Sequence, residues 1–538
     1  NKVFSNLDWV IVSIYIAGIV AIGLFYSRKK ESSDEYFLAS RNTGWFVIGA
    51  ALFASNIGSE HLVGLAGTGA NSGLPTVQFE ILASLILLIL GWFFVPYYLA
   101  SKISTTPEFL EKRFSPFARY YLSIISIFAY VITKIAVTVM AGGIVFETLM
   151  GIDFWVGALI IILLTGVYTI LGGLKAVVYT ETIQTFVLIF GSIVVLIFGL
   201  NELGGWNNMV EIAPVDFMSV WRPSDHPEFP WTGIIFGAPI LGIWYWCTDQ
   251  NIVQRVLSAK NIHEARRGTI FAGFLKITPL FLFVMPGIIA YCLNQEGVLQ
   301  LENSDQALPV LVQTLLPSGL RGLVAAGLLA ALMSSLASVF NSSSTLVTLD
   351  IYKKFKPHSS EKELVFVGQV STAILVVLGL LSIQLIEGGF FGGTLFVKIQ
   401  AIQGLISPPI AAVFLLGIFN KRVNNQGALA SLGVGFVLGM MRFFLLIFEP
   451  QDGTILHLLV SINFLHYAAY LFLVCTVVLI GVSYLTPPPD ESQTKGLTYD
   501  PSQNNTKKSF EEETQDKTDK ILSGLVVLAV VAVWVIFR

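Results

Sequence analysis

This sequence of 538 residues places several polar side chains inside long apolar runs. Glu80 and Lys276 lie deepest in such runs, and Asn56 and Gln400 add amide groups in two others. Three consecutive aromatic residues offer flat faces on which a sugar ring can stack: Trp244, Tyr245 and Trp246. Few polar groups in mostly apolar surroundings are typical of a site for a small polar ligand, and this set suits a sugar with its several hydroxyl groups.

A second group of residues could bind a small hard cation such as Na⁺. Ala331, Ser334 and Ser335 stand at i, i+3 and i+4, so one helical face offers two hydroxyl oxygens beside a small residue. Unwinding of the Gly-rich segment at residues 56–58 would expose further oxygens, the carbonyls near Ala54 and Ile57. Hard cations prefer oxygen ligands of this kind. The alternative is that both serines bond to their own helix backbone.

Other ionisable residues also lie inside apolar runs: Lys134, Glu181, Asp249, Lys398 and Arg442. A charge at the centre of a bilayer costs a few kcal/mol unless it is paired or hydrated, so each is a functional candidate. An internal salt bridge, or a side chain that reaches the membrane surface, is the structural alternative. That alternative is favoured for Lys134, Asp249 and Arg442.

The amino-acid composition indicates that these apolar runs lie in a lipid bilayer. Hydrophobic residues make up 54% of the chain and charged residues 12%, about half the usual share for a globular protein. The mean hydropathy is +0.73. The net charge of −3 provides no basic field for nucleic acid. Three scattered cysteines form no zinc or disulfide pattern. The chain is therefore predicted to be a polytopic all-α membrane protein.

Each crossing of a bilayer needs about 20 apolar residues, and the sequence contains about fourteen such runs. We predict transmembrane helices near 8–27, 44–69, 78–100, 119–149, 153–172, 176–200, 232–254, 268–292, 309–347, 364–386, 394–418, 427–448, 456–484 and 521–537. Counting Arg119 at the start of its span, nineteen Lys and Arg residues fall in alternate loops between residues 28 and 426, and the opposite loops hold few. By the positive-inside rule the nineteen face the cytoplasm, which puts both termini outside.

Two of these helices are expected to be broken, the second (44–69) and the seventh (232–254). The second carries Gly58, Gly64 and Gly67, and the seventh carries Gly237-Ala-Pro239 with Gly242. Broken helices at membrane depth survive beside a cavity or a bound ion. Two of them five spans apart indicate an inverted repeat with the binding site between its halves. Close packing of helices through small residues is the alternative.

This pattern divides the chain into six parts. We expect an N-terminal extra helix with its loop (1–43), a first repeat with an outer loop (44–230), a second repeat (231–420), two further helices (421–484), a cytoplasmic linker (485–520) and a C-terminal helix (521–538). The linker contains Pro487-Pro488-Pro489 and almost no apolar residue, so it is predicted to be a flexible tether.

Several segments resemble the sodium/glucose cotransporters of the sodium/solute symporter family. They are ASNIGSEHLVGLAGTG (54–69), WYWCTDQ (244–250), VQRVLSAK (253–260), LMSSL (332–336) and PPIAAVF (408–414). The matches are long, keep the same order and extend from about residue 5 to 484. The resemblance implies a leucine-transporter-like core of inverted five-helix repeats, with helices 1 and 6 of that core broken.

The resemblance also assigns roles to particular residues. It implies sugar contacts at Asn56, His61, Glu80, Tyr245, Trp246, Lys276 and Gln400. It implies an inner gate at Tyr245 and an outer gate at Leu65, Phe79 and Phe396. The sodium site falls on the carbonyls of Ala54, Ile57 and Ala331 and the hydroxyls of Ser334 and Ser335. Glu181 stands where the family has an aspartate linked to cation coupling. A second sodium site in the family uses a hydroxyl residue at the position that Ala337 occupies here.

From these features we expect a sodium-coupled symporter that imports a glucose- or galactose-type hexose by alternating access, with no bond made or broken. Lys398 and Gly242 depart from the pattern of the animal glucose carriers and leave the sugar open. The alternatives are a sodium symporter for sialic acid, myo-inositol or a proline-type solute, a sugar sensor, or a channel. The partners implied are the sugar, Na⁺ and the lipid bilayer, with no nucleic acid and no obligate protein partner. The expected location is a bacterial inner membrane.

Overall fold

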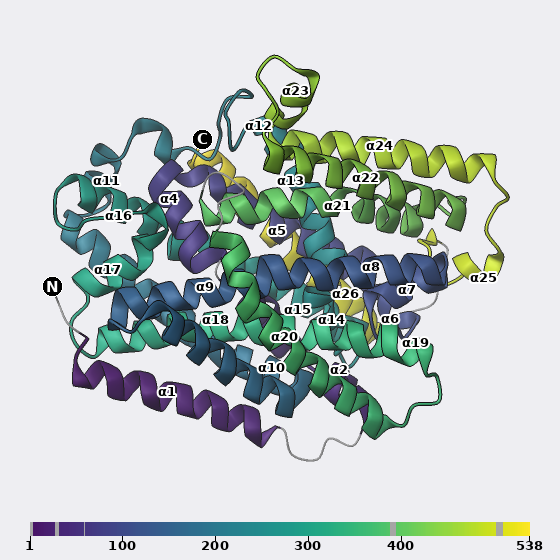
Figure 1. The fold of residues 1–538 in the computed structure, drawn as a ribbon, viewed down its shortest axis with the longest axis horizontal. Coiled ribbons are helices and arrows are strands. Elements are labelled where there is room, and N and C mark those ends of the chain that lie inside the picture. The colour runs from purple at the N-terminus through teal and green to yellow at the C-terminus, as the bar shows by residue number, and fades with distance from the viewer. Residues whose placement is uncertain (1–3, 27–31, 59, 388–393, 502–508) are drawn as a thin grey trace.

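The computed structural model describes residues 4–26, 32–58, 60–387, 394–501 and 509–538, and Figure 1 shows that its regular structure is helical. Within those ranges no strand is formed, and an isolated bridge joins Thr43 to Ala259. Eleven of the described helices are long and apolar enough to cross a membrane, or twelve if the bent pair Trp45–Asn56 and His61–Ser72 is one crossing. The predicted all-helical membrane architecture is confirmed, whereas the count is lower than the fourteen predicted runs.

The apolar stretches consist of α1 (Asn6–Phe25), α3 (Trp45–Asn56), η2 (Glu60–Leu65), α4 (Ala66–Ser72), α5 (Val77–Ile89), η4 (Leu90–Phe94), α6 (Val95–Ala100), α8 (Pro116–Ala129), η5 (Tyr130–Ile135), α9 (Ala136–Val145), η6 (Phe146–Met150), α10 (Phe154–Leu203), α12 (Trp231–Phe236), α13 (Ala238–Ile243), η8 (Trp244–Thr248), α14 (Gln250–Leu257), α15 (Ile262–Leu275), η9 (Leu280–Val284), α16 (Met285–Gln295), α18 (Leu320–Thr345), η11 (Leu346–Tyr352), α20 (Glu361–Glu387), α21 (Leu395–Phe419), α22 (Asn425–Phe448), α24 (Phe464–Leu485) and α26 (Phe510–Ile536). Shorter helices in the connections are α2 (Ser33–Leu38), α7 (Thr106–Arg113), α11 (Trp206–Ile212), α17 (Ala307–Leu315), α19 (Lys353–Phe355), α23 (Ile455–Ser461) and α25 (Glu491–Thr494).

The long helices lie roughly along the long axis of the molecule, with α1 along one edge and α24 along the opposite edge (Figure 1). Burial is uneven among them. In the most hydrophobic 18-residue segment of Leu320–Phe355, which contains α18, 94% of the residues are buried, against 22% in the corresponding segments of α1 and α26. A helix that is apolar on all sides belongs in the interior, whereas peripheral helices turn Leu, Ile and Phe outward to lipid. Helix α18, which carries the serine pair, is therefore the central element of the fold.

Helix α10 combines two of the predicted spans, 153–172 and 176–200. Gly173 lies between them with φ of 61° and ψ of −160°, a backbone conformation that glycine alone adopts readily. The backbone of Tyr36 is pressed against this glycine, and a methyl group there would come within 2.5 Å of its carbonyl oxygen. The chain therefore bends sharply at Gly173 and continues as a helix on both sides.

Two predicted spans begin too early. In the run 309–347, residues Ala307–Leu315 form the separate helix α17, and α18 starts at Leu320 after Gly319, whose φ is 92°. The run 456–484 likewise begins with the exposed helix α23, and the crossing helix α24 starts at Phe464. Hydropathy alone merged these pairs because the short helices are as apolar as the spans that they precede.

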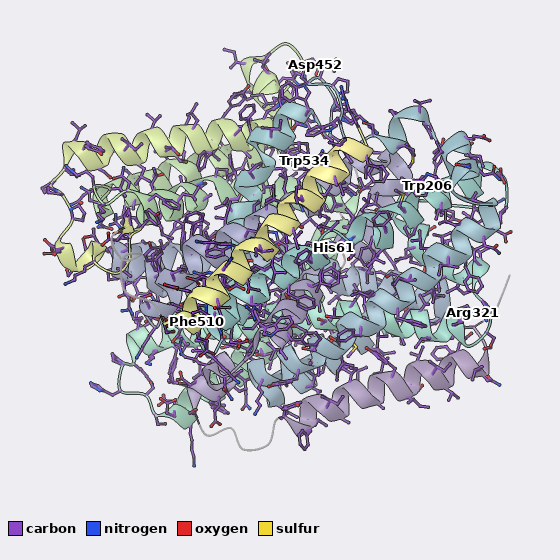
Figure 2. All side chains as sticks on the ribbon, turned by 180° about the vertical axis from the view of Figure 1, so that it is seen from behind. His61, Trp206, Arg321, Asp452, Phe510 and Trp534 are labelled. Atoms are coloured by element: carbon purple, nitrogen blue, oxygen red, sulfur yellow. The ribbon has the colours of Figure 1, made fainter. Side chains whose placement is uncertain are left out.

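Within the predicted linker 485–520, the described residues 485–501 and 509–520 contact the helix bundle. The amide of Tyr499 donates to the carbonyl of Ile418 at 2.8 Å, and its ring contacts Phe93 and Phe419. Helix α26 begins at Phe510 rather than near 521, and Asp519 pairs with Arg267 of α15 at 3.1 Å. In Figure 2, α26 crosses the back of the molecule from Phe510 to Trp534. Part of the predicted linker, 502–508, and the basic residues 28–30 lie outside the described residues.

Candidate substrate and sodium sites

The break predicted in the second span is present. Helix α3 ends at Asn56, and Ile57 follows with an extended backbone, φ −78° and ψ 96°. In the part of the chain that the structure describes, no hydrogen bond reaches the carbonyl oxygens of Ala54 or Ile57. Because a buried carbonyl without a partner is costly, these oxygens are suited to a cation.

The seventh span is interrupted twice, at Gly237 in the predicted segment and again, further along the chain, at Asp249. Gly237 separates α12 from α13, but α13 passes through Pro239 and Gly242 as a regular helix. Proline is tolerated there because it occupies the first turn, where its missing amide has no intrahelical acceptor. The extended residue is Asp249, with φ −80° and ψ 128°, directly after the wide turn η8 that holds Tyr245 and Trp246.

Five predicted ligand residues form one buried network. His61 Nε2 lies 2.7 Å from Glu80 Oε1, and the ammonium group of Lys276 forms an ion pair with the same carboxylate. Lys276 also donates to the Asn56 side chain, whose Nδ2 donates in turn to the Tyr245 hydroxyl at 2.8 Å. Helices α3, α5 and α15 are thus joined to η8 through polar groups. Glu80 and Lys276, which the sequence places in apolar runs, are paired with each other, and this pairing offsets part of the cost of burying them.

A small cavity of about 40 Å³ lies beside this network. Its lining includes Asn56, Glu80, Tyr245, Trp246 and Gln400 from the predicted ligand set. His61 and Lys276 contact Glu80 rather than the cavity itself. The remaining lining is mostly apolar and comes from α5 and α13, with one further amide, that of Gln403. A hexose needs several times this volume, so the site must widen to admit one.

Two of the predicted gate residues, Phe79 and Tyr245, line the cavity. The rings of Phe79 and Phe396 meet edge to face with centroids 5.3 Å apart, and Leu65 is buried in the same apolar cluster. Lys134 lies over the ring of Tyr245, 4.5 Å from its centroid. The sequence had favoured a structural role for Lys134, and this contact with a gate residue was not anticipated.

Of the predicted sodium ligands on α18, Ser335 lies directly beside the break that follows α3. Ser334 and Ala331 are buried, and Ser335 lies against Gly58, where an added methyl would come within 2.5 Å of its Oγ. The Ser334 hydroxyl makes no hydrogen bond in the described residues, although the Glu181 carboxylate lies close enough to interact with it. By contrast, Ser342 on the same helix bonds back to the Ser338 carbonyl at 3.0 Å. The back-bonded alternative therefore does not hold for Ser334.

Glu181 is bound to a residue that sequence reasoning missed. Its Oε1 lies 2.7 Å from Nη2 of Arg255 in α14, and neither side chain is exposed. Arg255 lies in the quoted motif at 253–260, but its sequence neighbours gave no sign of a partner on α10. The other ionisable residues favoured as structural are bonded too: Asp249 accepts from the Tyr130 hydroxyl, and Arg442 donates to the Ile462 carbonyl at 2.7 Å.

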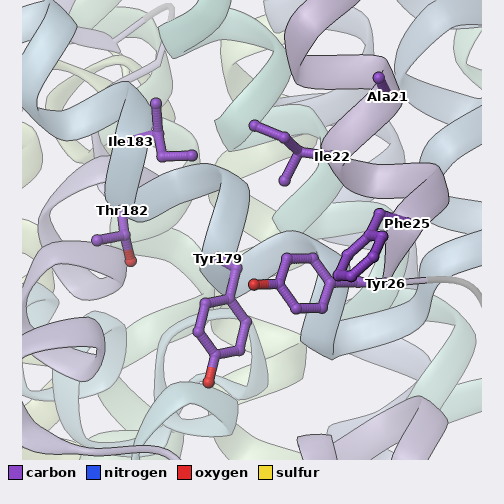
Figure 3. Close-up of a pocket in the computed structure, with 7 residues that line it drawn as sticks. All are labelled: Ala21, Ile22, Phe25, Tyr26, Tyr179, Thr182 and Ile183. Carbon is purple, nitrogen blue, oxygen red and sulfur yellow. The ribbon is translucent and has the colours of Figure 1, made fainter.

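A larger hollow, about 430 Å³, lies elsewhere, between the C-terminal end of α1 and the part of α10 that follows the bend at Gly173. Figure 3 shows Ile22, Phe25 and Ile183 around it, with the rings of Tyr26 and Tyr179 stacked at 4.7 Å. Most of this surface is apolar and belongs to the outer face of the helix bundle. It offers no converging polar groups for a hydroxylated solute, so the smaller central cavity is the candidate substrate site.

Broken helices around a central polar cavity in an all-helical bundle define a membrane transporter. Two solved transporters share the fold. A Na⁺-coupled sialic acid symporter matches with a TM-score of 0.79 at 23% identity over 91% of this chain and all of that one. The nucleobase-cation-symport-1 family transporter Mhp1 matches with a TM-score of 0.52 at 14% identity over 88% of this chain and 99% of that one.

The chain belongs to the sodium:solute symporter family, whose model matches residues 36–435. Sodium/glucose cotransporter 1 of Oryctolagus cuniculus is 38% identical over 91% of this chain and 80% of that protein. Solute carrier family 5 member 4 of Rattus norvegicus is 39% identical over 91% and 79%. Sodium/glucose cotransporter 4 of Danio rerio is 38% identical over 91% and 80%.

Proposed function

We propose that this chain is a sodium-coupled symporter that carries a monosaccharide of the glucose or galactose type across the membrane. The observation that carries the proposal is the junction of α3 and α18, where the break that holds the unbonded carbonyls of Ala54 and Ile57 packs through Gly58 against Ser335. The adjoining cavity supplies amide, carboxylate and aromatic groups for a hydroxylated ring. The names of the relatives given above agree with this substrate class.

Transport follows from coupling between the two sites. Na⁺ bound by Ala54, Ile57, Ala331, Ser334 and Ser335 holds the α3 break against α18 and so favours the outward-open arrangement. Asn56, the last residue of α3, belongs to the sugar network, so ordering this break also orders the sugar site. Sugar binding then closes Leu65, Phe79 and Phe396, and release requires Tyr245 to move. Na⁺ must bind the outward state more tightly for the gradient to drive uptake.

Uptake of labelled galactose into proteoliposomes tests the function. We expect accumulation with a Na⁺ gradient and none with K⁺, together with counterflow when unlabelled galactose is loaded inside. A channel gives no counterflow and a sensor gives no uptake. Uptake of sialic acid or proline in place of hexoses would overturn the substrate assignment. Both of these solutes carry a carboxylate, which the negative charge of Glu80 disfavours.

The sodium ligands are tested separately with Ser334→Ala and Ser335→Ala. Each removes one hydroxyl oxygen, and we expect the Na⁺ concentration for half-maximal uptake to rise about tenfold or more. Ser382→Ala on α20 is the matched control, because its hydroxyl only bonds back to the Leu378 carbonyl at 2.7 Å. Unchanged Na⁺ dependence in both site variants would show that the ion binds elsewhere.

For the topology we propose fourteen crossings, with inverted repeats at 44–230 and 231–420, in a bacterial inner membrane. Helix α10 has 50 residues and would be about 75 Å long if straight, too long for one crossing of a ~30 Å core. Its bend at Gly173 favours two, and Trp231–Leu257 is long enough for one more. With both termini outside, an epitope added at either end would be accessible in intact spheroplasts.

A further inference from the structure

Helix α26 lies on the outside of the bundle, yet it is bonded to a helix that carries part of the candidate substrate site. Only 22% of its most hydrophobic segment is buried. The buried apolar residues of this helix share one face and are Val526, Val530 and Val533. Its side-chain hydrogen bonds to the span that contains α5 lie toward the two ends of the helix, at Ser523 and at Trp534.

The bond at the outer end joins side chains 456 residues apart in the sequence. Nε1 of Trp534, labelled near one end of α26 in Figure 2, donates to Oε1 of Gln78 at 2.7 Å. Nε2 of Gln78 donates to the Val220 carbonyl at 3.3 Å, and the Val220 amide donates to the carbonyl of Phe537 at 2.9 Å. Three hydrogen bonds thus link the C-terminal turn of α26, the first turn of α5 and the segment before α12.

Gln78 directly precedes Phe79, whose side chain lines the central cavity and meets Phe396. Gln78 itself is fully buried and does not line the cavity. A buried amide that loses its partners is unfavourable, so both of its bonds restrain the first turn of α5. Because neighbouring residues in a helix share one backbone geometry, restraint of Gln78 also restrains the position of Phe79.

We infer that Trp534 is a positioning residue of the outer gate, which acts through Gln78 to hold Phe79 where Phe396 closes against it. The inference rests on the proposed function, in which these two rings close over the sugar. A gate residue that is already in place needs no further ordering when the sugar binds, and such preorganisation raises affinity. Trp534 therefore strengthens sugar binding without contacting the sugar.

The half-saturation concentration for Na⁺-driven galactose uptake is measured in Trp534→Phe, Gln78→Met and the double variant. Trp534→Phe keeps an aromatic ring and loses the N–H, and loss of one hydrogen bond should raise the half-saturation concentration about fivefold. Gln78→Met should raise it at least as much. The double variant should match Gln78→Met, because the indole N–H then has no acceptor to lose. The maximal rate and the Na⁺ dependence should change little, which separates this effect from general misfolding.

Trp92→Phe is the matched control. Nε1 of Trp92 in η4 donates to Oγ of Ser523 at 3.0 Å, so it joins α26 to the same span near the opposite end. The variant loses the same kind of bond between the same two parts of the bundle, but away from Phe79. Its half-saturation concentration for galactose should equal that of the unchanged protein.

Opening of the gate is also measured without transport, from the rate at which an impermeant methanethiosulfonate reagent labels Leu82→Cys in intact spheroplasts. Position 82 lines the cavity one turn from Phe79, and the three native cysteines are buried. We expect Trp534→Phe to speed this labelling about fivefold, by the same lost bond, and Trp92→Phe to leave it unchanged.

The inference is wrong if Trp534→Phe leaves both the half-saturation concentration and the labelling rate unchanged, or if Trp92→Phe alters them equally. It is also wrong if Trp534→Phe weakens sugar binding by its full factor in the Gln78→Met background, because the two residues then act independently. Failure of the unchanged protein to take up any hexose would overturn the proposed function instead. Labelling of Leu82→Cys would still decide whether Trp534 positions the gate.

Discussion

Glu181 of α10 and Arg255 of α14 form an ion pair whose side chains are both fully buried, with Nη2 of the arginine 2.7 Å from Oε1 of the glutamate. Arg255 also donates to the Asn251 carbonyl within α14. Helix α14 directly follows the break at Asp249, so the pair fixes this half of the broken helix to α10. The carboxylate that the resemblance links to cation coupling is thus neutralised by the protein itself.

Removing one partner of this pair should destabilise the protein strongly. Glu181→Gln leaves the Arg255 charge buried without a counter-charge, which costs about 3–5 kcal/mol. Thermal unfolding in detergent should show a clearly lower midpoint. Glu108→Gln provides the control: it breaks the partly exposed Lys112–Glu108 pair, where about 0–1 kcal/mol is expected. Equal midpoints for the two variants would contradict the importance of the buried pair.

Glu80→Gln should weaken sugar binding and spare sodium binding. The substitution removes the charge that Lys276 and His61 share, and leaves polar groups unsatisfied at the cavity wall. The loss of about 1–3 kcal/mol corresponds to a half-saturation concentration about tenfold higher or more. Glu147→Gln, an exposed carboxylate in η6, is the control and should behave like the unchanged protein. Unaltered half-saturation for both glucose and galactose would show that the sugar pocket is misplaced.

At Tyr245 the ring and the hydroxyl should contribute separately. Tyr245→Phe keeps the aromatic face for stacking and for Lys134, but removes the hydroxyl that accepts from Asn56 at 2.8 Å and from Lys134 at 3.4 Å. We expect uptake to persist in this variant at a few-fold lower affinity, since a hydrogen bond is worth about 1 kcal/mol and the longer of the two contributes little. Tyr245→Ala should abolish coupled uptake. Equal uptake by the Ala variant would remove Tyr245 from the inner gate.

The sequence predicted most of the membrane-spanning helices because hydropathy is a local signal. The break after Asn56 was also predictable, since glycines gather there. By contrast, the sequence located the seventh-span break at Gly237–Gly242, and the extended residue proved to be Asp249. Glycine and proline mark where a helix can break, while packing decides where it does, and α13 accommodates Pro239 in its first turn.

Side-chain partners were less accessible to sequence reasoning. Glu80 and Lys276 are almost two hundred residues apart, so their polar character was evident but their pairing was not. Arg255 and Gln403 were missed because each looks ordinary in its own segment. Their significance arises from what lies opposite: Glu181 for the first, and the polar cavity for the second. Such relationships require the three-dimensional arrangement of helices.

The last prediction is the coupling ratio, which we expect to be one Na⁺ per sugar. Ala337 is fully buried with a methyl group where a second site would need a hydroxyl oxygen, and Glu181 already has Arg255 as its cation. One ion moves one net charge per cycle, worth roughly 2.3 kcal/mol per 100 mV of membrane potential. Two ions would double that driving force and support a much steeper sugar gradient.

Reversal potentials in proteoliposomes with imposed Na⁺ and sugar gradients measure the coupling ratio directly. A ratio near one, with coupling lost in Ser334→Ala combined with Ser335→Ala, places all coupling at the junction of α3 and α18. A ratio near two, with a residual sodium response in Ser334→Ala, would mean that Glu181 exchanges Arg255 for an ion during the cycle and that the single-site mechanism is wrong.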